Sequence, residues 1–292
     1  MEVIEKEKIA NALAQYCERY ESQNRAANSL KGVSAATVSQ ILRGNWDLIK
    51  DEMWRNVKTQ INFKDNGWVA VPTVNYLRLM DIMNDARANA LVMGVTGNAG
   101  GGKTFALSHY AASNKRVYLM CCNEYWSRKD FMRELMGKIG KDANGCTVGE
   151  MMSTAIRELK STDSPLLILD EADKLADSVL LFFITLYNQL EDECGIILCA
   201  TDHLSKRIKN GVDANKKGYS EIWSRLGRRC VELKGVTAAD ITAICEANGV
   251  TKKNDIDDVI AKCDSDLRRV KRLCHAVKEK AKIEGESKTT SK

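Results

Sequence analysis

The sequence predicts an α/β fold built on a parallel sheet, with a small all-α domain before it and a helical subdomain after it. Short apolar runs at 91–95, 165–169 and 195–200 are typical of strands buried on both faces of a parallel sheet. A glycine-rich loop follows the first run and leads into a helical segment. Apolar residues at helical spacing occupy the chain before residue 61 and after residue 237.

The composition is that of a soluble chain, long enough for one large domain or two smaller ones. The 292 residues are 28% charged and 44% hydrophobic, and the net charge of +5 permits an anionic partner such as DNA without requiring one. The ten cysteines include no C-x-x-C pair, so the usual zinc spacing is missing and a reducing cytoplasm is the expected location. A charged N-terminus and a short apolar run at 179–187 predict neither a signal peptide nor a membrane partner.

The first 64 residues are expected to form a helix-turn-helix domain. Helical spacing at 9–20 is followed by two short helical segments, 22–30 and 34–44, around a turn at Gly32, and by a further helix at 46–61. Ser34 is placed to cap the second short helix. The outward face of that helix carries side chains that suit a DNA major groove, namely Ser34, Ala36, Thr37, Gln40 and Arg43.

Two observations keep a second interpretation of this domain open. Asp47, Asp51 and Glu52 lie close by and would repel phosphate. Helix-turn-helix folds also serve as interaction modules that never touch DNA.

The glycine-rich loop carries a specific pattern for binding phosphate. Gly97, Asn98, Ala99, Gly100, Gly101, Gly102, Lys103 and Thr104 read G-x-x-x-x-G-K-T. Glycine lets such a loop turn its N–H groups toward an anion, and the following helix adds its positive end. Lys103 is expected on the β- and γ-phosphates and the Thr104 hydroxyl on Mg²⁺. The order strand, loop, helix argues against a simple surface turn.

Polar residues follow the other two apolar runs. Asp170 and Glu171 end the run at 165–169, which is the Walker B pattern. Asp170 is expected to hold Mg²⁺ through water, and Glu171 to orient and polarise the attacking water. Thr201 ends the next run, where it is expected to contact the γ-phosphate as a sensor.

Arginines near residue 225 are candidates for a contact between subunits. Arg225, with Arg228 as second choice, is expected to reach the γ-phosphate of a neighbouring subunit and stabilise charge in the transition state. Thr237 with Asp240 starts a helical lid as a capping box, and Arg268 within the lid is placed to contact the nucleotide. Local salt bridges are the alternative for Arg225.

Breaks in these patterns predict where the domains begin and end. Asn66 and Gly67 interrupt the helical pattern, and the last residues are low in complexity. We therefore expect a helix-turn-helix domain at 1–64, a linker at 65–72, an α/β domain at 73–234, a lid at 235–283 and a disordered tail at 284–292.

The motifs together resemble the AAA+ ATPase family over about residues 69–283. The segment 169–175, LDEADKL, is most similar to transposition ATPases, and a helix-turn-helix before such a domain resembles the MuB family of target-DNA activators, with TnsC more distant. Thr201 departs from the asparagine that is common at its position. The resemblance implies an AAA+ P-loop parallel sheet with a helical lid, using ATP and Mg²⁺.

The resemblance also implies a mechanism. ATP would bind between subunits, and the ATP-bound chain would self-assemble into helical filaments on double-stranded DNA with little sequence preference. The filament would deliver target DNA to a transposase, which stimulates hydrolysis. Two stretches with basic side chains are candidates for the DNA contacts: Trp126, Arg128 and Lys129 in the first, and Lys206, Arg207 and Lys209 in the second.

Two other functions fit the same motifs. One is a helicase loader of the DnaC or IstB kind, which shares the ATPase core. The other is a repressor-like regulator that uses ATP only as a switch. Filaments on duplex DNA would favour the role in transposition, and a complex with a helicase would favour the helicase loader. Binding of a DNA operator by the N-terminal domain alone would favour the repressor-like regulator.

Overall fold

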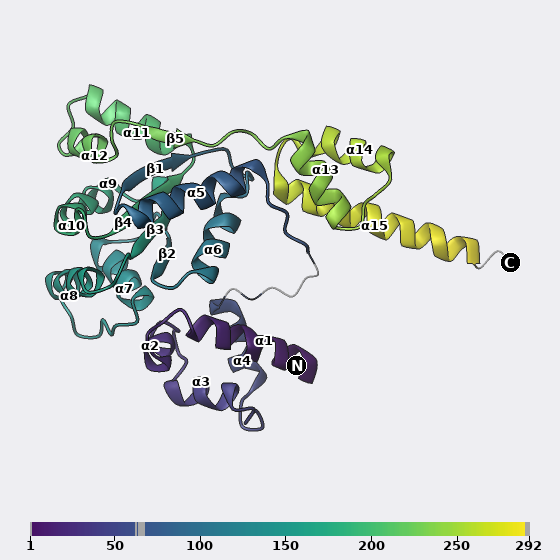
Figure 1. The fold of residues 1–292 in the computed structure, drawn as a ribbon, viewed down its shortest axis with the longest axis horizontal. Coiled ribbons are helices and arrows are strands. Elements are labelled where there is room, and N and C mark those ends of the chain that lie inside the picture. The colour runs from purple at the N-terminus through teal and green to yellow at the C-terminus, as the bar shows by residue number, and fades with distance from the viewer. Residues whose placement is uncertain (1, 62, 64–67, 290–292) are drawn as a thin grey trace.

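The computed structural model describes residues 2–61, 63 and 68–289, and its centre is a five-stranded sheet (Figure 1). The strands are β1 (Val92–Thr96), β2 (Val117–Cys121), β3 (Leu166–Asp170), β4 (Gly195–Ala200) and β5 (Cys230–Glu232). All pairs are parallel, in the order β2-β3-β4-β1-β5. The α/β parallel sheet expected from the apolar runs is therefore confirmed. All carboxyl ends lie at one edge of the sheet, and β4 separates β1 from β3.

Helices cover both faces of this sheet, and alternate residues of each central strand point to opposite faces. Leu166 and Ile168 pack with α5 (Val74–Ala88) and α6 (Lys103–Ser113). Leu167 and Leu169 pack with the helices of the other face. These are α7 (Arg128–Lys138), α8 (Val148–Lys160), α9 (Asp177–Leu180), α10 (Phe182–Leu190), α11 (Asp202–Asp213) and α12 (Tyr219–Arg225). Burial on both faces explains why the strands are continuously apolar.

Three helices form the lid, with a hydrophobic core of their own. They are α13 (Ala238–Ala247), α14 (Lys253–Cys263) and α15 (Leu267–Thr289), and the capping box of Thr237 and Asp240 starts α13 as expected. Asn248 of the lid holds the segment before α5, because its side chain exchanges hydrogen bonds with the N–H and C=O of Val69, both 2.9 Å. The helix α15 continues through part of the segment expected to be a disordered tail, and residues 290–292 lie outside the described residues.

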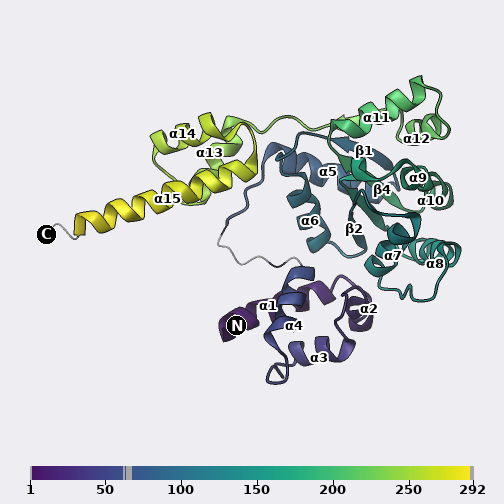
Figure 2. The ribbon, with the colours of Figure 1, turned by 180° about the vertical axis from the view of Figure 1, so that it is seen from behind.

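The N-terminal helices form a separate cluster that lies apart from the lid in both views (Figures 1 and 2). They are α1 (Val3–Cys17), α2 (Gln23–Asn28), α3 (Ala35–Leu42) and α4 (Asp51–Gln60), packed around fully buried Leu13, Ile41 and Trp54. The helix expected at 46–61 begins only at Asp51. Residues 46–50 turn instead, because the Trp46 indole donates to the Ile41 carbonyl at 2.9 Å and packs edge-on against Trp54.

This N-terminal domain contacts the α/β domain through polar groups. Arg25 pairs with Glu158 of α8 at 3.1 Å, and Lys31 pairs with Glu134 of α7 at 3.0 Å. A Cβ at Gly140 would approach the Arg25 carbonyl oxygen to 2.7 Å, so the two backbones lie close there. The linker expected at 65–72 is described only from Trp68 onward.

Candidate functional site

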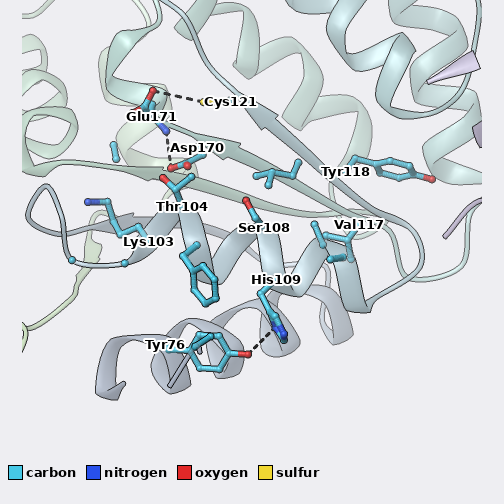
Figure 3. A pocket seen from close by; sticks show the side chains of 18 of the residues that line it. Tyr76, Lys103, Thr104, Ser108, His109, Val117, Tyr118, Cys121, Asp170 and Glu171 are labelled. Carbon is cyan, nitrogen blue, oxygen red and sulfur yellow. Dashed lines mark hydrogen bonds between the residues drawn. The ribbon is translucent and has the colours of Figure 1, made fainter. Parts of the chain in front are cut away.

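The glycine-rich loop joins β1 to α6 and lies at the carboxyl edge of the sheet (Figure 3). Gly100 and Gly102 adopt φ of 76° and 85°, a left-handed conformation that glycine takes without strain. The Lys103 ammonium donates to the carbonyls of Gly97 and Asn98 at 2.6 and 2.8 Å. These bonds hold the cation inside the turn, beside the N-terminus of α6, where an anion would bind.

Thr104 and Asp170 face each other across this site (Figure 3). Burial raises the pKa of Asp170, while the neighbouring Thr104 hydroxyl opposes the shift by stabilising the carboxylate. One carboxylate oxygen, Oδ1, accepts the Glu171 N–H at 3.0 Å. The other, Oδ2, is buried without a hydrogen-bond partner among the described residues. A buried, unsatisfied carboxylate oxygen beside a threonine hydroxyl fits Mg²⁺, which takes few protein ligands and keeps its waters.

This environment predicts a pH dependence for the Mg²⁺ requirement. Because burial raises the pKa of Asp170 above 3.8, protons compete with the metal at pH values where exposed carboxylates are still charged. Above the raised pKa the carboxylate can bind Mg²⁺, and below it cannot. We expect the Mg²⁺ concentration for half-maximal ATP hydrolysis to rise as pH falls from about 8 to about 5. A flat requirement over this range would contradict the assignment.

Glu171 leaves β3 in a left-handed conformation, with φ of 56°. Its carboxylate accepts a hydrogen bond from the Lys174 ammonium at 2.6 Å and another from the Cys121 thiol at 3.7 Å. Cys121 is the last residue of β2. Burial and the neighbouring carboxylates raise the pKa of Cys121 to about 11, so this thiol is a neutral donor. The backbone strain and the two donors together fix where Glu171 points.

Thr201 lies at the end of β4, between the loop strand and the acidic strand, as its position after the third apolar run predicts. Its hydroxyl donates to the Asp173 carboxylate. Asp173 belongs to the 3-10 turn η1 (Ala172–Lys174), directly after the acids of β3. The two residues line the same cleft as Lys103 and Asp170, so the structure brings all four together.

The lid closes one side of this cleft. The Leu267 N–H at the start of α15 donates to the Gly100 carbonyl at 3.0 Å, and Arg268 lines the cleft with Lys103. The cleft has a volume of about 1250 Å³ and extends to the segment before α5 and to the N-terminal domain. An anion-binding loop, two acids, a polar strand end and a lid arginine thus surround one space large enough for a nucleotide.

A comparison with protein families agrees with this geometry. Residues 86–208 match the model of the AAA domain family, and the match spans the loop, both acids and Thr201. This part of the chain is similar to AAA domains. The family supports a nucleotide-dependent ATPase, for which ATP is the general ligand and Mg²⁺ the typical ion. No curated protein matches the chain.

The arginines expected to act between subunits lie outside this cleft. Arg225 ends α12, where its guanidinium donates to Asn188 at 2.7 and 3.0 Å and lies over the Tyr187 ring. It is not among the described residues that line the cleft, and Arg228 is exposed beyond it. A contact of either arginine with the nucleotide of another protomer stays a prediction.

Two of the residues expected to bind DNA have other roles. Trp126 is only 8% exposed, because it packs edge-on against Phe131 across the N-terminus of α7. Ser127 and Asp130 form a capping box there, and this aromatic pair is the hydrophobic staple that accompanies one. Arg207 is largely buried and donates to protein groups alone among the described residues. These contacts occupy much of both side chains, and the two DNA contacts stay predictions.

The other candidate residues have accessible side chains. Arg128 donates to the Ser178 carbonyl at 3.1 Å yet remains exposed, as do Lys129, Lys206 and Lys209. On α3, Ser34 caps the helix by accepting the Thr37 N–H at 3.0 Å, while Gln40 and Arg43 face solvent. The outward face expected for this helix is therefore present in the structure.

Several residues of the site carry no signal of their own in the sequence. Thr201 is held by a hydrogen bond to Asp173, and Glu171 is held by hydrogen bonds from Lys174 and Cys121. Each of these three partners is an ordinary residue at a strand end or in a turn. Asp173 and Lys174 follow the acids closely enough to be considered with them. Cys121 could be found only by knowing that β2 pairs with β3.

Among the described residues, no helix combines the length and apolar character that crossing a bilayer requires. In the same part of the chain, no cluster of three or more His, Cys, Asp or Glu side chains is arranged to hold a metal.

Proposed function

We propose that the chain is an ATP-dependent, largely non-sequence-specific DNA-binding ATPase of the MuB kind, which assembles on double-stranded DNA and delivers it to a transposase. One observation supports the DNA contact most directly. Arg128 of α7 holds the Ser178 carbonyl, and Arg207 of α11 holds Asp177, so both basic stretches flank the short helix α9. Lys129 and Lys206, next to these arginines, are exposed on α7 and α11, the helices that follow the carboxyl ends of β2 and β4.

The hydrolysis step uses groups already in place. Lys103 and the loop N–H groups bind the phosphates, and Glu171 orients and deprotonates the attacking water. Mg²⁺, held by Thr104 and Asp170, would neutralise charge on the phosphates. Thr201 lies between these groups. When ATP binds, its hydroxyl gives up the hydrogen bond to Asp173 and donates to a γ-phosphate oxygen instead.

Assembly explains why Arg225 lies away from the cleft of its own protomer. In the proposed filament each nucleotide lies at a junction, and Arg225 of one protomer reaches the nucleotide of the next. ATP then stabilises the junction, and each added protomer adds DNA contacts. Heterologous contacts that do not close into a ring give a helical filament.

Arg225→Ala is expected to lower hydrolysis in the assembled state by about 10³-fold, because an arginine finger contributes on that order. Nucleotide binding to the dilute protomer should stay as in the wild type. Arg228→Ala is the matched control, since it removes the same charge three residues away. Normal DNA-stimulated turnover in Arg225→Ala, with loss in Arg228→Ala, would transfer the role to Arg228.

Electron microscopy with duplex DNA tests the proposal as a whole. We expect filaments with ATP and none with ADP or without nucleotide. Replacing both Lys129 and Lys206 by alanine should reduce the slope of log affinity against log salt by about two. Protein that remains monomeric on DNA with every nucleotide would rule the filament out.

The exposed face of α3 favours a second candidate, a repressor-like regulator switched by ATP. Gln40 and Arg43 face solvent on a helix whose packing against α1 and α2 leaves its polar side free. Under this alternative, one DNA sequence would bind far more tightly than others, and Arg43→Ala would remove the preference. Equal affinity for all duplexes favours the first proposal.

A further inference from the structure

Arg207 lies at a junction of three elements next to the proposed ATP site. It belongs to α11, the helix that follows Thr201, and its side chain is only 26% exposed. One terminal nitrogen, Nη1, donates to the carbonyls of Asp173 and Leu175 at 3.2 and 2.7 Å. The other two nitrogens donate to one carboxylate oxygen of Asp177, at the start of α9. A planar, five-donor group makes such a set of contacts well, and an ammonium does not.

The segment that Arg207 holds is the turn that carries the catalytic candidates. Glu171 enters this turn in a left-handed conformation, which strains a non-glycine backbone and persists only where the surroundings enforce it. Asp173 accepts the Thr201 hydroxyl from the same turn. Two carbonyls of the turn, those of residues 173 and 175, are fixed by a single guanidinium.

Arg207 also connects this turn to α12. Its Nε lies 3.4 Å from the Tyr219 hydroxyl, and the Tyr219 ring packs closely against Gly211 of α11. Hydrogen bonds from Tyr219 and Arg207 lower the pKa of Asp177, so this carboxylate stays charged and keeps its partners. The helix α12 ends six residues later at Arg225, the proposed finger.

We infer that Arg207 is a positioning residue for ATP hydrolysis: it fixes the turn of Glu171 and Asp173 and ties it to the helix that carries Arg225. The inference rests on the proposed ATPase function. It requires that Arg207 act through the turn, with no contact to nucleotide or DNA.

Kinetics of Arg207→Ala and Arg207→Lys test the inference in the full-length protein. We expect kcat to fall at least about tenfold in both variants, with KM for ATP changed by less than about threefold, because a misplaced base slows chemistry more than binding. Added guanidinium at millimolar concentration should restore part of the activity of Arg207→Ala, and methylammonium should not. Unchanged kcat, or rescue by methylammonium as well, would overturn the inference.

Lys217→Ala is the matched control, since it removes a charge from an exposed residue of the α11–α12 connection. Lys217→Ala should leave hydrolysis without DNA as in the wild type. Arg207→Ala should lower hydrolysis without DNA and leave DNA affinity and its salt dependence unchanged. Loss of DNA affinity without loss of basal hydrolysis in Arg207→Ala would make Arg207 a DNA contact.

Hydrogen exchange separates this inference from the proposed function. Amides of residues 171–177 should exchange faster in Arg207→Ala, while those of β3 keep wild-type protection. If wild-type protein hydrolyses no ATP, the proposed function fails, and exchange in this turn still decides whether Arg207 positions it. Unchanged exchange at 171–177 would overturn the inference in either case.

Discussion

Lys103→Ala is expected to abolish ATP hydrolysis and with it ATP-dependent DNA binding. The ammonium lies inside the loop, held by the carbonyls of Gly97 and Asn98, and a bound phosphate would add a charge-assisted contact. A hydrogen bond to a charged group contributes about 1.5–3 kcal/mol, which corresponds to a loss of roughly 10- to 150-fold in nucleotide affinity. Titration with a fluorescent ATP analogue, beside DNA binding with and without ATP, measures both effects.

Lys115→Ala serves as the control for this variant, because Lys115 is an exposed lysine just before β2, at the opposite edge of the sheet. It loses the same charge far from the loop and should behave as wild type. If Lys103→Ala loses ATP binding yet keeps wild-type DNA affinity in the presence of ATP, nucleotide and DNA binding are not coupled.

Glu171→Gln is expected to bind ATP normally and hydrolyse it about 10²- to 10⁴-fold more slowly, the usual contribution of a positioned general base. The amide keeps the size of the side chain and still accepts from Lys174 and Cys121, so the strained turn should keep its shape. Filaments formed with ATP should then persist, because the proposed disassembly requires hydrolysis. Single-turnover hydrolysis and filament lifetime by microscopy provide the two measurements.

Glu124→Gln is the matched substitution, on an exposed carboxylate of the β2–α7 connection at the same edge of the sheet. Its turnover should be that of wild type. Wild-type turnover in Glu171→Gln would instead remove Glu171 from the reaction and leave Asp173, its neighbour in the turn, as the carboxylate to test next.

The elements that the sequence predicts well have local causes. Continuous apolar runs mark β1, β3 and β4 because both faces of these strands are covered, and the loop motif requires glycine at left-handed positions. The capping residues Ser34 and Thr237 begin α3 and α13 for the same kind of local reason. Such features need no knowledge of distant contacts.

The structural contacts that the local sequence does not predict depend on partners elsewhere in the fold. The carbonyls that bind Arg207 are 32 and 34 residues away in the chain, and nothing in the local pattern distinguishes this arginine from its exposed neighbours. Trp126 differs, because the capping box after it is visible in the sequence and predicts a buried staple. At 46–50, the hydrogen bond of Trp46 to Ile41 overrides helical spacing.

The order of the strands places a whole strand, β4, between the loop of Lys103 and the acid Glu171. Neighbouring strands lie about 4.8 Å apart, so two spacings put the motifs on the order of 10 Å from each other. Asp170 lies beside Thr104 of the loop, so under the proposed function only the terminal phosphate of a bound ATP has to extend to Thr201 and Glu171. A nucleotide that is one phosphate shorter would then leave Thr201 and Glu171 without a phosphate to contact.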